Sequence, residues 1–193
     1  MEKLNLAFKM CVFGNSGVGK STLINRYITA KFDVNQKSTI GADILMKLIE
    51  TDTTRITLQI WDFGGEDKFK SLLPIYSQGS SAAIFMCDIS NRDSITTINE
   101  WLLTFDAGLK NQDPKFPLIV VGGKLDLEEF RSLNKEDIED ILEVPKKFDY
   151  IECSSKTGEN VDFLFQTLVE KMMIYGNIQP LEARKYSNFS IKA

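Results

Sequence analysis

Eight residues near the N-terminus constrain the fold of this chain more than any other feature. Positions 14–21 read Gly-Asn-Ser-Gly-Val-Gly-Lys-Ser, a G-x-x-x-x-G-K-S pattern. The preceding run Ala7–Phe13 is mostly apolar and β-prone, and the following apolar residues recur at helical spacing, namely Leu23, Ile24, Tyr27 and Ile28. Glycines let such a loop curl so that successive N–H groups point inward, and the next helix adds its positive N-terminal end. Strand, loop and helix in this order predict a phosphate-binding loop for a nucleoside triphosphate.

The side chains of this loop have predicted roles. Lys20 is placed to reach the β- and γ-phosphates, and the Ser21 hydroxyl is placed to ligate Mg²⁺. The other predicted phosphate contacts come from Asn15, Ser16, Gly17, Val18, Gly19 and Thr22. The alternative interpretation is an ordinary glycine-rich turn, which the flanking strand and helix patterns disfavour.

The composition fits one α/β domain. The chain has 193 residues, of which 43% are hydrophobic, enough for a sizeable core. We expect the domain at residues 1–175 and a flexible tail at 176–193, where periodicity is weak. A formal charge of −4 argues against a nucleic-acid-binding surface. Histidine is absent, which excludes Ser-His-Asp catalysis and H-E-x-x-H zinc chemistry.

The cysteines and the apolar runs bear on location. Cys11, Cys87 and Cys153 each lie in or at the end of a strand-like apolar run, which predicts reduced core residues. No apolar stretch reaches the about 18 residues of a membrane span, and the N-terminus lacks a secretory signal. We therefore expect a cytoplasmic protein, and a monomer.

The remaining pattern alternates strands with helices. Strands are predicted at 6–13, 43–51, 55–62, 82–89, 117–122 and 150–154. Helices are predicted at 20–30, around 95–109, from the N-cap Asn134 to about Val144, and in a last segment with Phe163, Leu164, Leu168 and Met172 on its apolar face. This order predicts an α/β three-layer P-loop NTPase fold, with a six-stranded, mostly parallel sheet, one antiparallel strand and about five helices. Residues 31–42 and 63–80 are candidate mobile loops.

A second motif ends the strand predicted at 55–62. The sequence there reads Trp61-Asp62-Phe63-Gly64-Gly65. Asp62 can orient Mg²⁺, and Gly65 can offer an unhindered backbone N–H to the γ-phosphate. An aspartate at a strand end is often only a turn residue. The spacing in sequence between Asp62 and the phosphate loop favours the metal-binding role here.

Two further motifs predict recognition of guanine. Gly123-Lys124-Leu125-Asp126 and Cys153-Ser154-Ser155-Lys156 each follow a strand-like run. Guanine presents N1–H and its exocyclic amine side by side, so one aspartate, Asp126, can accept both. The stems of Lys124 and Lys156 can cover the two faces of the base, and a backbone N–H near Ser155 can donate to O6. Taken singly, each residue is more often a solvated loop charge.

Together these motifs resemble the Ras superfamily of small GTPases, and Rab GTPases most closely. The resemblance covers about residues 6–175 and rests on 14–17, Ser38–Asp43, Leu58–Asp62 and Cys87–Ser90. It implies the small G protein fold and a switch that binds GTP or GDP with Mg²⁺ and hydrolyses GTP. Thr39 is then a ligand of Mg²⁺ together with Ser21 and Asp62, and Phe32 packs edge-on against guanine.

The resemblance also implies partners and catalytic positions. Effectors, an exchange factor and an activating protein would bind the loops around Thr39 and Glu66–Tyr76. Catalysis would fall to Glu66, Lys20 and Gly65, and the role would be Rab-like regulation of partners, with trafficking as a candidate process. No cysteine follows Cys153, so no direct membrane anchor is seen. Either the sequence is cut short, or the protein reaches membranes through partners, or it does not reach them.

Two departures from the family pattern affect function. The family's water-orienting glutamine is Glu66 here, and a carboxylate can only accept a hydrogen bond and repels phosphate. We therefore expect slowed hydrolysis, unless repulsion raises the pKa of Glu66 enough for it to act as a base. The family's N-K-x-D asparagine is Gly123, which predicts about tenfold weaker nucleotide binding.

Three readings remain open from the sequence. The first is a guanine-nucleotide switch with slow hydrolysis, and the second is a GTP-loaded interaction module that has lost hydrolysis. The third is a P-loop kinase or ATPase, which Asp126 disfavours because adenine offers it no donor pair.

Overall fold

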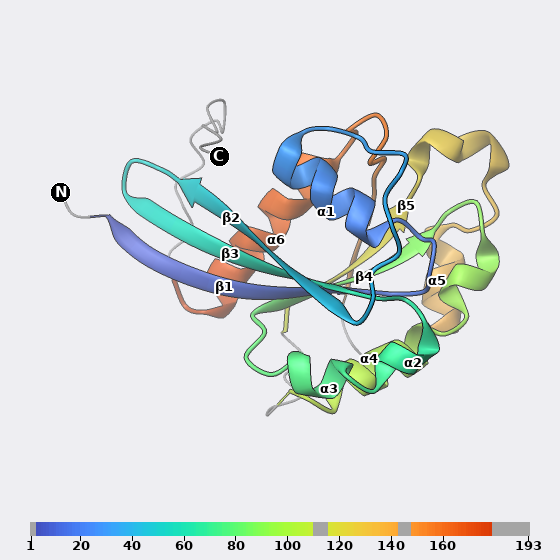
Figure 1. Ribbon diagram of the computed structural model, residues 1–193, viewed down its shortest axis with the longest axis horizontal. Helices are drawn as coiled ribbons and strands as arrows, with labels where there is room; N and C mark the ends of the chain where they lie inside the picture. The colour runs from blue at the N-terminus through green and yellow to red at the C-terminus, as the bar shows by residue number, and fades with distance from the viewer. Residues whose placement is uncertain (1–2, 110–115, 143–147, 179–193) are drawn as a thin grey trace.

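A six-stranded sheet runs through the molecule in the order β2-β3-β1-β4-β5-β6 (Figure 1). The computed structural model describes residues 3–109, 116–142 and 148–178. The strands are β1 (Leu4–Phe13), β2 (Ala42–Glu50), β3 (Thr54–Phe63), β4 (Ala82–Asp88), β5 (Leu118–Gly123) and β6 (Asp149–Glu152). All neighbouring pairs are parallel except β2 with β3. The predicted sheet, with its single antiparallel strand, is confirmed.

Helices cover both faces of the sheet. The α-helices are α1 (Lys20–Thr29), α2 (Asp67–Lys70), α3 (Leu73–Tyr76), α4 (Ile98–Asp106), α5 (Lys135–Ile141) and α6 (Val161–Tyr175), with 3-10 helices η1 (Arg92–Ile95) and η2 (Leu125–Phe130). Figure 1 shows α1 and α6 above the sheet and α2, α3 and α4 below it. This arrangement confirms the predicted three layers.

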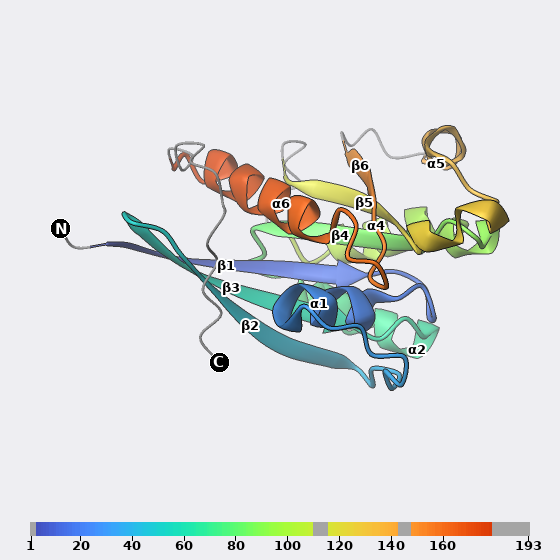
Figure 2. The same ribbon diagram turned by 90° about the horizontal axis from the view of Figure 1, so that it is seen from above.

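Alternation along the strands explains why the sheet has a core on each side. On β1, Met10 and Val12 pack with α1 and α6, whereas Cys11 and Phe13 pack with α4. Figure 2 shows α1 and α6 lying across the sheet, where Tyr27 of α1 stacks on Phe165 of α6 with ring centroids 3.8 Å apart. The continuous apolar run of β4 is buried throughout, as expected for a central parallel strand.

The hairpin of β2 and β3 positions two loops at the same end of the sheet. Its antiparallel register runs from Ala42 opposite Phe63 to Glu50 opposite Arg55. On β3, the side chains of Ile56, Leu58 and Ile60 are fully buried, which confirms the predicted alternation. The carboxyl ends of β1 and β3 lie side by side, because Val12 is paired with Asp62.

Several helix predictions need adjustment. Phe163 was predicted on the apolar face of α6 but is 58% exposed, so that prediction is wrong; the buried face carries Leu164, Leu168 and Met172 as expected. Residues 63–80, predicted as a loop, contain the four-residue helices α2 and α3. These helices are too short for a periodic pattern to reveal.

The predicted start of α5 is confirmed. Asn134 is its N-cap and forms a capping box with Asp137, in which each side chain accepts the other residue's backbone N–H. The predicted end near Val144 and the tail from 179 onward lie outside the described residues. All three cysteines are buried and free, as predicted. In the described ranges, the helices are too short or too polar to cross a membrane.

Candidate functional site

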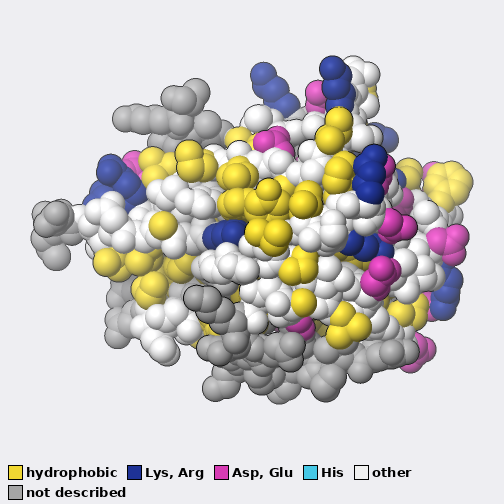
Figure 3. All heavy atoms as spheres, turned by 60° about the horizontal axis from the view of Figure 1, so that its bottom comes forward, with side chains coloured by type: hydrophobic (Ala, Val, Ile, Leu, Met, Phe, Trp, Pro, Cys, Tyr) yellow, Lys and Arg dark blue, Asp and Glu magenta, His cyan; other side chains and the backbone are white. Residues whose placement is uncertain are grey.

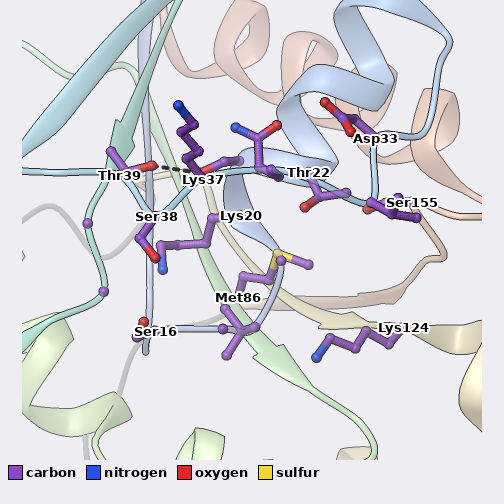
Figure 4. A pocket seen from close by; sticks show the side chains of 18 of the residues that line it. Ser16, Lys20, Thr22, Asp33, Lys37, Ser38, Thr39, Met86, Lys124 and Ser155 are labelled. Carbon is purple, nitrogen blue, oxygen red and sulfur yellow. Dashed lines mark hydrogen bonds between the residues drawn. The ribbon is translucent and has the colours of Figure 1, made fainter.

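The loop after β1 curls around a cavity at the carboxyl ends of the strands. Gly14, Gly17 and Gly19 adopt positive φ angles of 139°, 79° and 104°, which side chains disfavour. At Gly14 a Cβ atom would lie 2.3 Å from the carbonyl oxygen of Met86, so this position also demands glycine. The cavity has a volume of about 340 Å³ and receives residues from the loop, from α1 and from the loops after α1, β3, β5 and β6 (Figure 4).

Lys20 is held inside this loop. Its side chain is almost buried, and Nζ donates to the carbonyl oxygens of Gly14 and Asn15, both at 2.8 Å. Burial lowers the pKa of Lys20 to about 8, although the nearby Asp62 opposes that shift. An anion in the cavity would restore the preference for the charged form, so this ammonium group is suited to a phosphate.

Three oxygen-bearing side chains from different elements converge beside Lys20. Thr39 Oγ1 lies 2.8 Å from Ser21 Oγ and donates to Asp62 Oδ2 at 3.0 Å, and Ser21 Oγ also donates to that carboxylate. Asp62 Oδ1 is buried without a hydrogen-bond partner among the described residues. Burial raises the pKa of Asp62, although hydrogen bonds from Ser21 and Thr39 oppose the shift. The orphaned oxygen indicates that this cluster is built for a further ligand.

The donor set fits Mg²⁺. Two hydroxyls and one carboxylate are hard oxygen ligands, and Mg²⁺ commonly takes one or two carboxylates and completes its shell with water and phosphate. Within residues 3–109, 116–142 and 148–178, no group of three or more His, Cys, Asp or Glu side chains could hold a metal by itself.

Gly64 and Gly65 press the loop after β3 against the other two loops. At Gly65 a Cβ atom would lie 2.3 Å from Ser16 N, and at Gly64 it would lie 2.6 Å from Thr39 O. Gly64 N also donates to Gly41 O at 2.8 Å, next to the Ala42–Phe63 pair at the open end of the hairpin. The loops before β2 and after β3 therefore begin at one hydrogen-bonded point.

The other end of the cavity carries the predicted base-recognition residues. Asp126 accepts from Ser154 Oγ at 2.6 Å, and its Oδ2 lies 3.7 Å from Lys156 Nζ. Lys124, in the left-handed conformation with φ of 65°, donates from Nζ to Asp88 Oδ2 at 2.6 Å. Burial alone would raise the pKa of Asp88, but hydrogen bonds from Lys124 and Ser90 outweigh it and leave the pKa lowered. These contacts fix a carboxylate acceptor and two lysine stems around one end of the cavity.

Comparison with known proteins now identifies the family. The model of the Ras family matches residues 9–174. The chain belongs to the Ras family. Similar relatives include the human Ras-related protein Rab-30, 33% identical over 173 residues, which are 90% of this chain and 83% of the relative. The Ras-related protein Rab7 of Pisum sativum is 32% identical over 90% of this chain and 85% of its own. The Ypt/Rab-type GTPase avaA of Emericella nidulans is 32% identical over 89% and 85%.

Most of the site residues predicted for this Ras-family chain line the cavity. They are Ser16, Gly17, Val18, Gly19, Lys20, Ser21, Thr22, Phe32, Thr39, Gly65, Glu66, Lys124, Asp126, Ser155 and Lys156. Asp62 and Ser154 stand behind this wall as partners of Thr39 and Asp126. The Asn15 side chain turns toward α4 instead, where Oδ1 accepts from Thr97 Oγ1 at 2.7 Å and from Trp101 Nε1 at 2.9 Å.

Glu66, the departure from the Ras-family glutamine, stands at the mouth of the cavity. Its side chain is 46% exposed and forms an ion pair with Lys68 at 2.8 Å. The carboxylate therefore pairs with a cation in the first turn of α2, the helix for which Glu66 is the N-cap.

Sequence reasoning missed part of the lining. The missed residues are Asp33, Val34, Gln36, Lys37, Ser38, Phe63, Gly64 and Met86. Apart from Met86, each missed residue lies within three positions of a predicted one, so proximity to Phe32, Thr39 or Gly65 could have found them. Met86 lies inside a buried strand, where no pattern separates a cavity-lining residue from a core residue.

Proposed function

We propose that this chain is a guanine-nucleotide switch that binds GTP and GDP with Mg²⁺ and hydrolyses GTP slowly. The observation that carries the proposal is one cavity with a phosphate loop and the Ser21, Thr39 and Asp62 cluster at one end and Asp126 at the other. Membership of the Ras family supports it, as do relatives named Ypt/Rab-type GTPases.

The phosphate end would neutralise and orient the triphosphate. Loop N–H groups and Lys20 would bind the phosphate oxygens, and the N-terminal end of α1 would add positive potential. Ser21, Thr39 and Asp62 would hold Mg²⁺, which supplies positive charge to the phosphates when bound. The close packing of Gly65 against Ser16 puts its backbone N–H within this charged end.

The base end would select guanine. The Asp126 carboxylate is fixed by Ser154 and can accept from both N1–H and the exocyclic amine of guanine. Adenine offers no such donor pair, so an ATPase or kinase would leave a partly buried carboxylate without a ligand.

Hydrolysis would be slow because the attacking water meets a carboxylate in place of an amide. Glu66 can only accept, and its ion pair with Lys68 draws it from the phosphates. We expect Glu66→Gln to raise the single-turnover rate of GTP hydrolysis about tenfold. A fully oriented acid-base group contributes about 10²–10⁴-fold to a rate, and the glutamine would recover part of that contribution. Glu129→Gln, at an exposed residue of η2, is the matched control. A faster rate in the native protein than in Glu66→Gln would contradict the proposal.

The second candidate is an interaction module that holds GTP without turning it over, and the Glu66–Lys68 pair favours it. Chromatography of the nucleotide released on denaturation separates the two. GDP indicates a working switch, whereas GTP indicates the interaction module. Adenine nucleotide, or failure to bind any guanine nucleotide on reloading with Mg²⁺, would overturn both.

Partners would bind the loops around Thr39 and Glu66–Tyr76. Between these loops, the outer positions of β2 expose alternate apolar side chains, namely Ile44, Met46 and Leu48, each at least half exposed. Figure 3, which brings the α2 and α3 side forward, shows hydrophobic side chains gathered near the middle of this face. We place the protein in the cytoplasm as a monomer, reaching membranes through these partners.

A further inference from the structure

Met86 is a buried strand residue that also forms part of the cavity wall. It lies on β4 and is 1% exposed, yet its side chain lines the cavity. Figure 4 shows it between the loop that carries Ser16 and Lys20 and the strand end that carries Lys124. Its place is therefore between the phosphate end and the base end.

Gly123 leaves the space that Met86 occupies. At Gly123 a Cβ atom would lie 2.4 Å from Met86 Cε, far closer than the about 3.5–4.0 Å at which carbon atoms pack. The same atom would lie 3.3 Å from the carbonyl oxygens of Val18 and Cys87, so those groups leave little room to move. Met86 with its present rotamer and a side chain at 123 exclude each other.

The Met86 methyl also faces the phosphate loop at Gly19. At Gly19 a Cβ atom would lie 3.5 Å from Met86 Cε, an ordinary packing distance. One flexible thioether thus fills the gap between the first turn of α1 and the end of β5. Methionine suits an irregular gap of this kind because it is unbranched and polarizable.

The geometry points to Met86 and Gly123 as one affinity-determining unit of the nucleotide site. Met86 supplies the apolar wall on which the nucleoside packs, and Gly123 keeps the space that admits it. This inference rests on the proposed guanine-nucleotide function. It also revises what Gly123 implies, because the lost side-chain contact is replaced by an apolar one from another strand.

The unit has a specific signature in paired substitutions. Gly123→Ala pushes the end of Met86 toward the open side, which is the cavity, and so speeds GDP release about tenfold. Met86→Val leaves a gap in the wall and speeds release by a similar factor, about tenfold. The double variant removes the clash and partly refills the gap, so its release rate should lie within about threefold of the native rate.

The experiment measures release of fluorescently labelled GDP in Mg²⁺ from the native protein, both single variants and the double variant. Met172→Val, a buried methionine on α6 outside the cavity lining, is the matched control and should leave release unchanged. The ratio of GDP to IDP affinity should stay constant in all variants, because Met86 offers no hydrogen bond to the 2-amino group. Circular dichroism at saturating GDP checks that each protein is folded.

Two results would overturn the inference that Met86 and Gly123 act as one unit. One is additivity, with the double variant releasing GDP about a hundredfold faster than native protein. The other is an unchanged release rate in folded Met86→Val. If Gly123→Ala alone does not fold, a double variant with Met86→Val that does fold supports the unit because the clash is removed, whereas a double variant that also fails to fold overturns it. Native protein that binds no guanine nucleotide would instead refute the proposed function.

Discussion

Asp126 is the residue on which guanine selectivity depends. Its side chain is 15% exposed and is held by Ser154 and, at longer range, by Lys156. A partly buried carboxylate held in place by a neighbouring hydroxyl loses little freedom when it meets a ligand, so its two acceptor oxygens can discriminate between bases.

Asp126→Asn should therefore exchange the preferred base. The amide presents a donor to the 2-oxo group of xanthine and leaves one guanine donor unpaired. We expect GDP affinity to fall about a hundredfold and xanthosine diphosphate to become the tighter ligand. Competition binding measures both, with Glu128→Gln as the control on a neighbouring exposed acid. An unchanged preference would show that the base lies elsewhere.

Arg131 stabilises the strand end that leads to the base loop. It donates to both Glu152 oxygens, at 2.7 and 2.6 Å, and Tyr150 Oη donates to Glu152 at 2.7 Å. The hydrogen bonds from Arg131 hold the pKa of Glu152 below its ordinary value. A lowered folded-state pKa gives stability that is present above the unfolded value and lost as pH falls through the folded one.

Arg131→Gln should thus lower the free energy of unfolding by about 2 kcal/mol at pH 7. The gap between native and variant should narrow as the pH falls from about 5 towards 3. Urea unfolding across this range measures the gap. Arg55→Gln, which breaks a more exposed pair with Glu50 at 2.7 Å, should cost under about 1 kcal/mol. A gap that does not change with pH would argue against this account.

At the scale of elements, α4 links the phosphate loop to α2. Trp101 of α4 donates to Asn15, and its ring lies 5.0 Å from Lys70 Nζ. Lys70, a nearly buried residue of α2, forms ion pairs with Asp67 and Glu100 at 2.9 and 2.7 Å. One aromatic side chain therefore contacts both the loop that would hold phosphate and the segment that would bind partners.

Trp101→Phe tests this link while keeping an aromatic ring against Phe13. It removes one buried donor from Asn15, which keeps only Thr97, so GDP release should speed up about three- to tenfold. Stopped-flow release of labelled GDP measures the rate. Thr104→Ala, on the exposed side of α4, is the control. Release at the native rate would mean that Thr97 alone holds Asn15 in place.

Elements with strong patterns could be predicted, and those shaped by tertiary contacts could not. The strands were predictable because runs such as Ala82–Cys87 are apolar throughout, and the phosphate loop was predictable from its glycines. The prediction that Phe163 is buried was wrong because apolar spacing in α6 does not show which residues the sheet covers. The orientation of Asn15 and the role of Met86 depend on α4 and β5, which lie far away in the sequence.

At the scale of the whole molecule, a ligand bound in the cavity would add to the free energy of unfolding. The cavity buries Lys20 and Asp62, and burial shifts the pKa of each toward its neutral form. Asp62 Oδ1 also lacks a hydrogen-bond partner among the described residues, so a ligand that pairs with these groups would recover free energy. At about a thousandfold excess over Kd, a ligand adds about 4 kcal/mol to stability.

GDP with Mg²⁺ should accordingly raise the Tm by about 8–16 °C in a chain of this size. Scanning fluorimetry with and without EDTA measures the effect, and ATP at equal concentration is the control. An equal shift with ATP would contradict guanine selectivity.

The hydrogen bond between Gly64 and Gly41, at the open end of the hairpin, gives the molecule a property that neither loop has alone. Since the loops before β2 and after β3 start from Gly41 and Gly64, joined by one hydrogen bond, they share a single joint. A displacement of either loop at this point therefore strains the hydrogen bond to the other loop. A partner that binds one loop is therefore affected by the position of the other, so the surface formed by the two loops presents one combined conformation at a time.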